Sequence, residues 1–231
     1  VALSGIALLN VAFVYPKLKS VYRKFYKMHA DPTHYVFMDI EIDGRDMGRL
    51  DFELFGQKAP RTVNSFLAFC SGEFNRYDWY KGCTFHRKFE KRFLQSGDFI
   101  HRDGTGSQTV YDDPEKPGHL LKTIPAETND LTFDEPYLLA MAANEKGETG
   151  CQFFITTGAL TPLNGSNHTI IGRLLKGKET IDVMESLETY RLFANDQSRD
   201  LAASGGLPNS IPELPKVNPK TSVIISDCGV Y

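Results

Sequence analysis

The chain has 231 residues, of which 41% are hydrophobic and 12% aromatic, and its formal net charge at pH 7 is -3. This length and apolar content predict one well-buried domain plus an extension, and they exclude a disordered chain. Residues 1–30 contain five basic residues and no acidic one, so the rest of the chain has 21 basic residues against 29 acidic ones. An acidic body lacks the cations that neutralise phosphates, so we expect no nucleic-acid partner.

The N-terminal segment, residues 1–30, is apolar first and basic afterwards. Residues 1–15 are apolar except at three positions, and residues 17–27 are basic and aromatic. The pattern predicts an apolar helix that anchors the chain in a membrane, with a partner-buried helix and a signal-peptide remnant as alternatives. Fifteen helical residues span about 22 Å, short of the roughly 30 Å hydrocarbon core, so a full crossing requires local thinning or residues upstream of Val1.

The positive flank of this segment favours the cytoplasmic or matrix side of a membrane for the body of the chain. We therefore expect residues 1–27 to bind a membrane or a membrane-protein complex, with the mitochondrial inner membrane as the expected compartment. The remaining residues, 31–231, are expected to form the folded domain.

The pattern changes to that of strands at Tyr35. Residues 36–42 and 49–55 alternate in polarity, and the connection containing Asp43-Gly44 predicts a β-hairpin between them. Helical spacing of apolar residues after Pro60 predicts a helix over residues 62–70.

A second helix is expected over residues 180–187, and an apolar strand over residues 222–226 closes the chain. Many short strands with two helices predict a mainly β fold, a closed antiparallel barrel capped by the helices. Residues 204–219 contain four prolines and two glycines and are expected to form a surface loop.

The four cysteines are widely spaced, with no CxxC pair and no nearby group of histidines. This arrangement predicts buried free thiols and indicates neither a zinc site nor a dense disulfide framework. We expect no metal and no other cofactor.

Several blocks in one order resemble the active-site framework of the cyclophilins. They are Phe85-His86-Arg87, Gln95-Ser96-Gly97-Asp98-Phe99, Asp103-Gly104-Thr105-Gly106, Gly150-Cys151-Gln152-Phe153-Phe154-Ile155 and the late His168. The resemblance covers about residues 35–231, including the ending Asp227-Cys228-Gly229. It implies the cyclophilin-like barrel and peptidyl-prolyl cis-trans isomerase activity on proline-containing polypeptides.

By this resemblance, Arg87 is the catalytic arginine, which forms hydrogen bonds around the prolyl amide. Arginine suits the task because it stays charged and offers a rigid fork of donors. The resemblance also implies substrate-binding roles for Phe93, Gln95, Gly104, Gln152, Phe154, Leu163 and His168. Gln95 holds the substrate backbone, and Gln152, in the second such block, has an amide that can both donate and accept. Phe154 is the floor of the proline pocket, with Leu163 and His168 as further walls. Taken singly, each residue also has an ordinary explanation as an ion pair, a core side chain or a turn.

Three positions depart from the family pattern. Arg92 stands where the family usually has a pocket phenylalanine, and Phe93 follows it. Ala143 replaces a backbone-binding asparagine unless Asn144 reaches in. The tryptophan that contacts cyclosporin falls at Pro162, which predicts weak cyclosporin binding and disfavours a role as a drug-binding immunophilin.

The turn before His168 is also one residue longer than usual, which leaves the position of that side chain open. Two hypotheses therefore remain. One is a membrane-tethered prolyl isomerase that acts on X-Pro bonds in unfolded chains or loops. The other is a structural or assembly subunit of a membrane complex, built on a cyclophilin-like domain with reduced or no activity.

Overall fold

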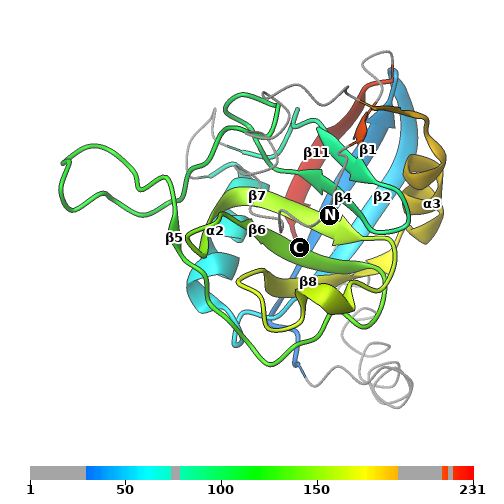
Figure 1. The fold of residues 1–231 in the computed structure, drawn as a ribbon. Coiled ribbons are helices and arrows are strands. Elements are labelled where there is room, and N and C mark those ends of the chain that lie inside the picture. Colours follow the sequence, from blue (N-terminus) through cyan, green and yellow to red (C-terminus); the bar gives the residue numbers. More distant parts are fainter. Residues whose placement is uncertain (1–29, 74–78, 192–214, 218–220) are drawn as a thin grey trace, which may run out of the picture. The chain divides into compact units, whose positions relative to one another are not determined.

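The computed structural model describes residues 30–73, 79–191, 215–217 and 221–231 (Figure 1). Residues 32–231 form one compact unit. The predicted apolar helix and its basic flank, residues 1–27, lie outside the described residues. Across the described parts of the chain, no helix combines the length and the hydropathy needed to cross a membrane.

One curled antiparallel sheet forms most of this unit (Figure 1). Its strands follow the order β11-β1-β2-β8-β6-β7-β4-β3, and β5 pairs with β7 beside this path. The strands are β1 (His34–Ile42), β2 (Arg45–Leu54), β3 (Arg87–Phe89), β4 (Phe93–Ser96), β5 (Ile124–Pro125), β6 (Leu138–Ala143), β7 (Glu148–Thr156), β8 (Thr169–Lys176) and β11 (Val223–Val230).

The two edges of the sheet are joined by the residues just before β3. Phe85 N donates to Val223 O at 2.9 Å, and Ile225 N donates to Cys83 O at 2.9 Å. Thr84 lies between these bonds and forms an antiparallel bridge to Ile224. The predicted mainly β, barrel-like fold is confirmed, and these bonds satisfy backbone groups that an open edge would expose.

The predicted hairpin is present as β1 and β2. Both residues of its turn have positive φ, 49° at Asp43 and 78° at Gly44. A two-residue hairpin turn of this kind matches the right-handed twist of the strands, and Asp-Gly adopts it at low cost. Along β1, alternate side chains are buried, so the polarity pattern of the sequence corresponds to the inner and outer faces of the sheet.

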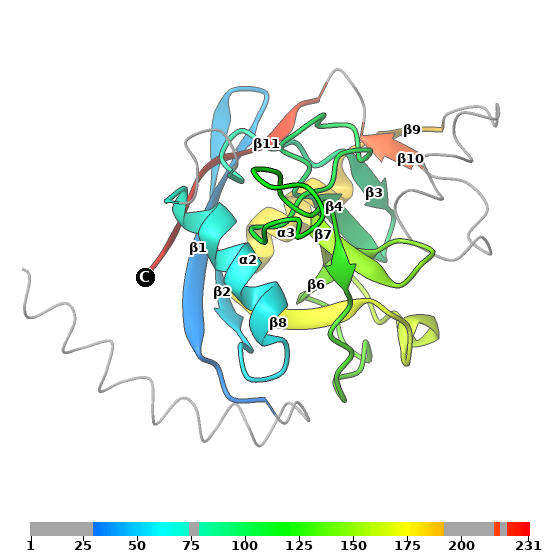
Figure 2. The same cartoon turned by 90° about the vertical axis from the view of Figure 1, so that its left-hand side faces the viewer.

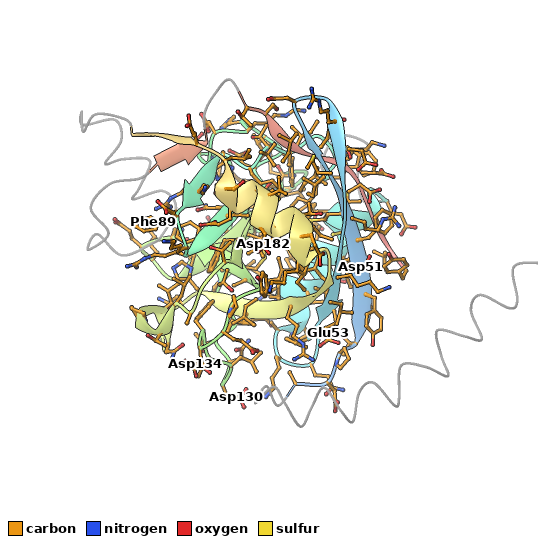
Figure 3. All side chains as sticks on the ribbon, turned by 90° about the vertical axis from the view of Figure 1, so that its right-hand side faces the viewer. Asp51, Glu53, Phe89, Asp130, Asp134 and Asp182 are labelled. Atoms are coloured by element: carbon orange, nitrogen blue, oxygen red, sulfur yellow. The ribbon has the colours of Figure 1, made fainter. Side chains whose placement is uncertain are left out.

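The two predicted helices are α2 (Pro60–Ser71) and α3 (Lys178–Ser186). Pro60 starts α2 at a position where a missing N–H costs nothing, and Gly72 ends it in the left-handed conformation with φ 68°. Figure 2 shows α2 in front of the sheet, and Figure 3, from the opposite side, shows α3 in front. The helices therefore cover opposite ends of the curled sheet.

A group of aromatic rings fills the core between α2 and the sheet. Tyr80 lies 5.1 Å from both Phe66 and Phe153, measured between ring centroids. Its hydroxyl donates to Cys151 O at 2.8 Å, so the buried polar atom is satisfied. The four cysteines are all buried free thiols, as expected.

Most of the expected surface loop over residues 204–219 lies outside the described residues, and the expectation is wrong for residues 215–217. Within it, β10 (Pro215–Val217) pairs with β9 (Thr189–Arg191) in an antiparallel ladder. Pro215 is the first residue of its strand, a position where proline is tolerated. Pairing with a segment distant in sequence leaves no local pattern, which is why proline content alone missed this strand.

Candidate active site

Strand pairing places the predicted catalytic arginine beside the predicted binding residues. Arg87 in β3 lies opposite Gln95 in β4, and Gln95 in turn lies opposite Phe154 in β7. Directly opposed residues of antiparallel strands point to the same face of the sheet. Three residues from separate sequence blocks therefore share one face.

A chain of hydrogen bonds connects these side chains. Arg87 Nη1 donates to Gln95 Oε1 at 3.3 Å, and Gln95 Nε2 donates to Gln152 Oε1 at 2.8 Å. Gln152 Nε2 donates to two backbone carbonyls, Gly104 O at 2.8 Å and Gly106 O at 2.7 Å. The amide group of Gln152 has only two N–H donors. Both therefore bind the protein itself, and Gln152 acts here as a link between the 104–106 turn and Gln95.

Arg87 is charged and buried. Its exposed fraction is 7%, and burial lowers the pKa of the guanidinium to about 10, so it stays protonated at neutral pH. Its Nε atom is buried without a hydrogen-bond partner among the described residues. An unsatisfied charged donor is costly in a folded protein. A hydrogen-bond acceptor that reached this atom would satisfy it.

An aromatic cluster, defined as Phe93, Phe133, Phe154 and His168, lies next to Arg87. The Phe154 ring centroid is 5.6 Å from Phe93, 5.9 Å from Phe133 and 5.5 Å from His168. The guanidinium carbon of Arg87 lies 5.3 Å from the Phe93 ring centroid. The arrangement brings an apolar surface and a buried cation together.

The turn of unusual length leads to His168, whose ring lies against Phe154. Its ring meets Phe154 at an interplanar angle of 89°. Its Nδ1 accepts a 3.1 Å hydrogen bond from the backbone N–H of Ala143, which puts the proton of the neutral ring on Nε2. Ser166, within the turn, accepts from His168 N through its hydroxyl at 3.2 Å. The turn therefore helps to hold the histidine beside Phe154.

Leu163 lies in a short 3-10 helix, η1 (Thr161–Leu163), and is buried. This helix is fixed to the loop that carries Phe133. Leu160 N donates to Phe133 O at 2.7 Å, and Phe133 N donates to Asn164 Oδ1 at 2.6 Å. Leu163 thus sits in the segment that holds one ring of the aromatic cluster.

The departure at Arg92 has a structural explanation. Phe93 is buried and contacts Phe154, whereas Arg92 is exposed and lies over the Phe89 ring at 4.9 Å. Phe89 stacks on Phe93, with centroids 6.0 Å apart. The aromatic contact to Phe154, the predicted floor of the pocket, is therefore made by Phe93.

Asn144 does not take over from the asparagine that Ala143 replaces. Its Oδ1 accepts from Lys146 N at 2.9 Å and from Glu148 N at 3.0 Å. Its Nδ2 donates to Glu148 Oε2 at 3.0 Å. The side chain is occupied within its own turn.

Asp98, His101 and Asp103 are the one group of potential metal ligands found in the described part of the chain. The Asp98 carboxylate already accepts five backbone N–H bonds within its loop. Asp103 Oδ1 accepts from both the backbone and the hydroxyl of Thr105. These carboxylate oxygens hold a turn together. They already accept hydrogen bonds from the protein, which does not favour binding of a metal ion.

Sequence reasoning missed two rings of this site. Phe133 stacks on Phe154 at an interplanar angle of 19°, and Phe89 extends the row beyond Phe93. Phe89 carried one available signal, since it is two residues after Arg87 and so on the same face of a strand. Phe133 lies in a loop, where no periodicity marks it.

Comparisons with known proteins agree with this geometry. The sequence model of the family described as "Cyclophilin type peptidyl-prolyl cis-trans isomerase/CLD" matches residues 37–202. A curated relative, "Peptidyl-prolyl cis-trans isomerase, rhodopsin-specific isozyme" from Calliphora vicina, is 32% identical over 181 residues. The alignment covers 78% of this chain and 73% of the relative. The chain belongs to the cyclophilin-type peptidyl-prolyl cis-trans isomerase family.

Proposed function

We propose that this chain catalyses cis-trans isomerisation of X-Pro peptide bonds in polypeptides, with Arg87 as the catalytic residue. One observation carries the proposal: the Arg87 guanidinium is buried beside the aromatic cluster, and its Nε has no hydrogen-bond partner among the described residues. Family membership supports the same reaction.

The reaction needs no nucleophile, because no covalent bond is broken. The barrier of roughly 18–20 kcal/mol comes from resonance between the prolyl nitrogen lone pair and the carbonyl. A fixed donor aimed at that nitrogen localises the lone pair and lowers the double-bond character as the bond twists. Arg87 supplies the charged donor, and Gln95 restrains it through the 3.3 Å hydrogen bond.

The aromatic cluster supplies the other requirement, an apolar surface for the proline ring. Its central ring, Phe154, is surrounded by two phenylalanines and His168. Apolar contact would hold the ring while the chain on the other side of the bond rotates. We assign Phe93, Phe154, Leu163 and His168 to this surface, and Gln95 to the substrate backbone.

The test is a prolyl-isomerisation assay on the full chain and on Arg87→Ala. Removing one donor aimed at the transition state is expected to lower kcat roughly 100-fold to 1,000-fold. Arg45→Ala is the matched control, because Arg45 is an exposed arginine at the start of β2. Full activity in Arg87→Ala would refute the assignment.

A structural or assembly subunit is the second candidate, and two observations favour it. Ala143 has no side-chain amide, and the amide of Asn144 is bound within its own turn. Pro162 is exposed where the family pattern has tryptophan. A folded wild-type chain that shows no catalysis would support this candidate over the first.

We further propose that residues 1–27 attach the chain to a membrane or to a membrane-protein complex, with the mitochondrial inner membrane as the compartment to examine first. The apolar and basic pattern of this segment supports the proposal. Extraction of isolated membranes separates the cases. Release by alkaline carbonate would argue against insertion, and release only together with a large assembly would favour the subunit role.

A further inference from the structure

A buried carboxylate is connected to the proposed active site by hydrogen bonds. Asp98 is 0% exposed and belongs to the loop that follows β4. Its Oδ1 accepts from Ile100 N at 3.1 Å and from His101 N at 2.8 Å. Its Oδ2 accepts from Asp103, Gly104 and Gly106 N at 3.3, 2.9 and 3.0 Å. The Asp98 carboxylate therefore accepts hydrogen bonds from backbone N–H groups between residues 100 and 106 and holds this turn in place.

The turn is also restrained from the opposite side. Gly104 has φ 94°, and a Cβ placed on it would lie 2.9 Å from Cδ2 of His86. Glycine alone fits this conformation and this contact. With Asp98 holding its N–H groups and His86 packed against it, the turn points the carbonyls of Gly104 and Gly106 at Gln152.

The direction of these carbonyls decides the orientation of two amides. Because both carbonyls are acceptors, Gln152 must present its NH2 group to the turn and its Oε1 to Gln95. Gln95 must then turn its own NH2 group to Gln152. Its Oε1 is left for Arg87, which is a donor only. Each link admits one orientation.

We propose that Asp98 is a positioning residue for Arg87 and acts through the 104–106 turn, Gln152 and Gln95. The inference rests on the proposed isomerase function. Asp98 needs no contact with substrate in this role. Asp98 fixes the turn whose carbonyls orient the Gln152 amide, and Gln152 in turn orients the Gln95 amide. The oxygen of Gln95 then holds the Arg87 guanidinium.

The charge state of Asp98 agrees with this role. Burial by itself would raise the pKa of the carboxyl, but backbone N–H bonds from His101, Gly106 and Gly104 lower it below its ordinary value. The group is thus ionised at neutral pH. Hydrogen bonds to a carboxylate are stronger than those to a neutral acceptor, so the turn is held firmly.

The first test compares Asp98→Asn with Asp103→Asn by kcat and KM. Asparagine keeps the size of the side chain but puts N–H groups where the turn requires acceptors. Asp103 belongs to the same turn, but only its Oδ1 accepts hydrogen bonds, both from Thr105. Asparagine can keep that oxygen in place, so Asp103→Asn is the matched control. We expect kcat to fall roughly 10-fold to 100-fold in Asp98→Asn, because a shift of about 1 Å in the position of a catalytic group such as the Arg87 guanidinium lowers the rate by this much. The control should keep wild-type kcat.

A double variant separates positioning from general loss of structure. If Asp98 acts through Gln95, Asp98→Asn should lower kcat in the wild-type background but have little further effect in the Gln95→Ala background. Equal losses in both backgrounds would overturn the inference, because the two residues would then act independently.

A readout independent of catalysis distinguishes this inference from the proposed function. The NMR signal of the Arg87 Nε–H group reports how rigidly the guanidinium is held, whether or not the protein isomerises proline. We expect the signal to shift and broaden in Asp98→Asn and to stay unchanged in Asp103→Asn. Should Asp98→Asn not fold, Gln152→Glu breaks the same chain of bonds at its second link and should change the signal in the same way. An unchanged Arg87 signal in the folded variant refutes the positioning role and leaves the proposed function standing.

Discussion

The backbone N–H of Ala143 donates a 3.1 Å hydrogen bond to Nδ1 of His168. Ala143 is the last residue of β6, and His168 directly precedes β8. The bond therefore fastens two neighbouring strands at the edge of the aromatic cluster. It also holds the His168 ring perpendicular to Phe154, so one contact serves both the fold and the site.

The first prediction concerns this bond. His168→Leu removes the acceptor and leaves the N–H of Ala143 buried and unsatisfied. We expect the free energy of unfolding to fall by about 1–3 kcal/mol, measured by urea denaturation. His119→Leu, at an exposed histidine, should change it little. Equal stability of the two variants would contradict the prediction.

Phe154 is expected to be the most sensitive position of the aromatic cluster. Phe154→Ala would leave a cavity among three ring neighbours, so unfolding free energy should decrease by about 3–5 kcal/mol. Isomerase activity should be lost at temperatures where the variant is still folded. Phe37→Ala is the comparison, because Phe37 lies on the half-exposed outer side of β1. A similar loss of activity there would remove the special role of Phe154.

His86 predicts a specific dependence of stability on pH. Burial lowers the pKa of His86 to about 4, below the roughly 6.5 of an unfolded histidine. Between these values the unfolded chain binds more protons than the folded one. The contribution of neutral His86 to the free energy of unfolding is therefore fully present above about pH 6.5 and is lost as the pH falls toward 4.

The expected size of this effect is about 3 kcal/mol. Urea denaturation at pH 7 and at pH 4.5 should show that His86→Leu loses less stability on acidification than the wild type does. His119→Leu should behave like the wild type, because that histidine is exposed. Parallel losses in His86→Leu and the wild type would show that another group controls the acid response.

Cyclosporin binding tests the departure at Pro162. The exposed proline offers no aromatic ring to the inhibitor, so we expect weak binding by calorimetry. Pro162→Trp should tighten it up to about tenfold, since an aromatic contact contributes ~0.5–1.5 kcal/mol beyond burial. Tight binding by the wild type would mean that other residues replace the missing ring.

Local patterns in the sequence predicted several elements correctly. The alternation before and after Asp43-Gly44 predicted β1 and β2, and helical spacing predicted α2 and α3. These succeeded because neighbouring residues alone determine a hairpin turn and an amphipathic face. The short strand β10 was missed, because its partner β9 lies more than twenty residues earlier in the chain.

The sequence by itself determined which chemical groups the site contains. Arg87, the two glutamines and Phe154 were identified because they stand in sequence blocks that resemble those of the cyclophilins. Only the tertiary structure decided how these groups are used. It showed that Gln152 gives both donors to the 104–106 turn, that Phe133 joins the aromatic cluster, and that five backbone N–H groups converge on Asp98. Hydrogen-bond direction and ring packing depend on segments far apart in the chain, and no local pattern encodes them.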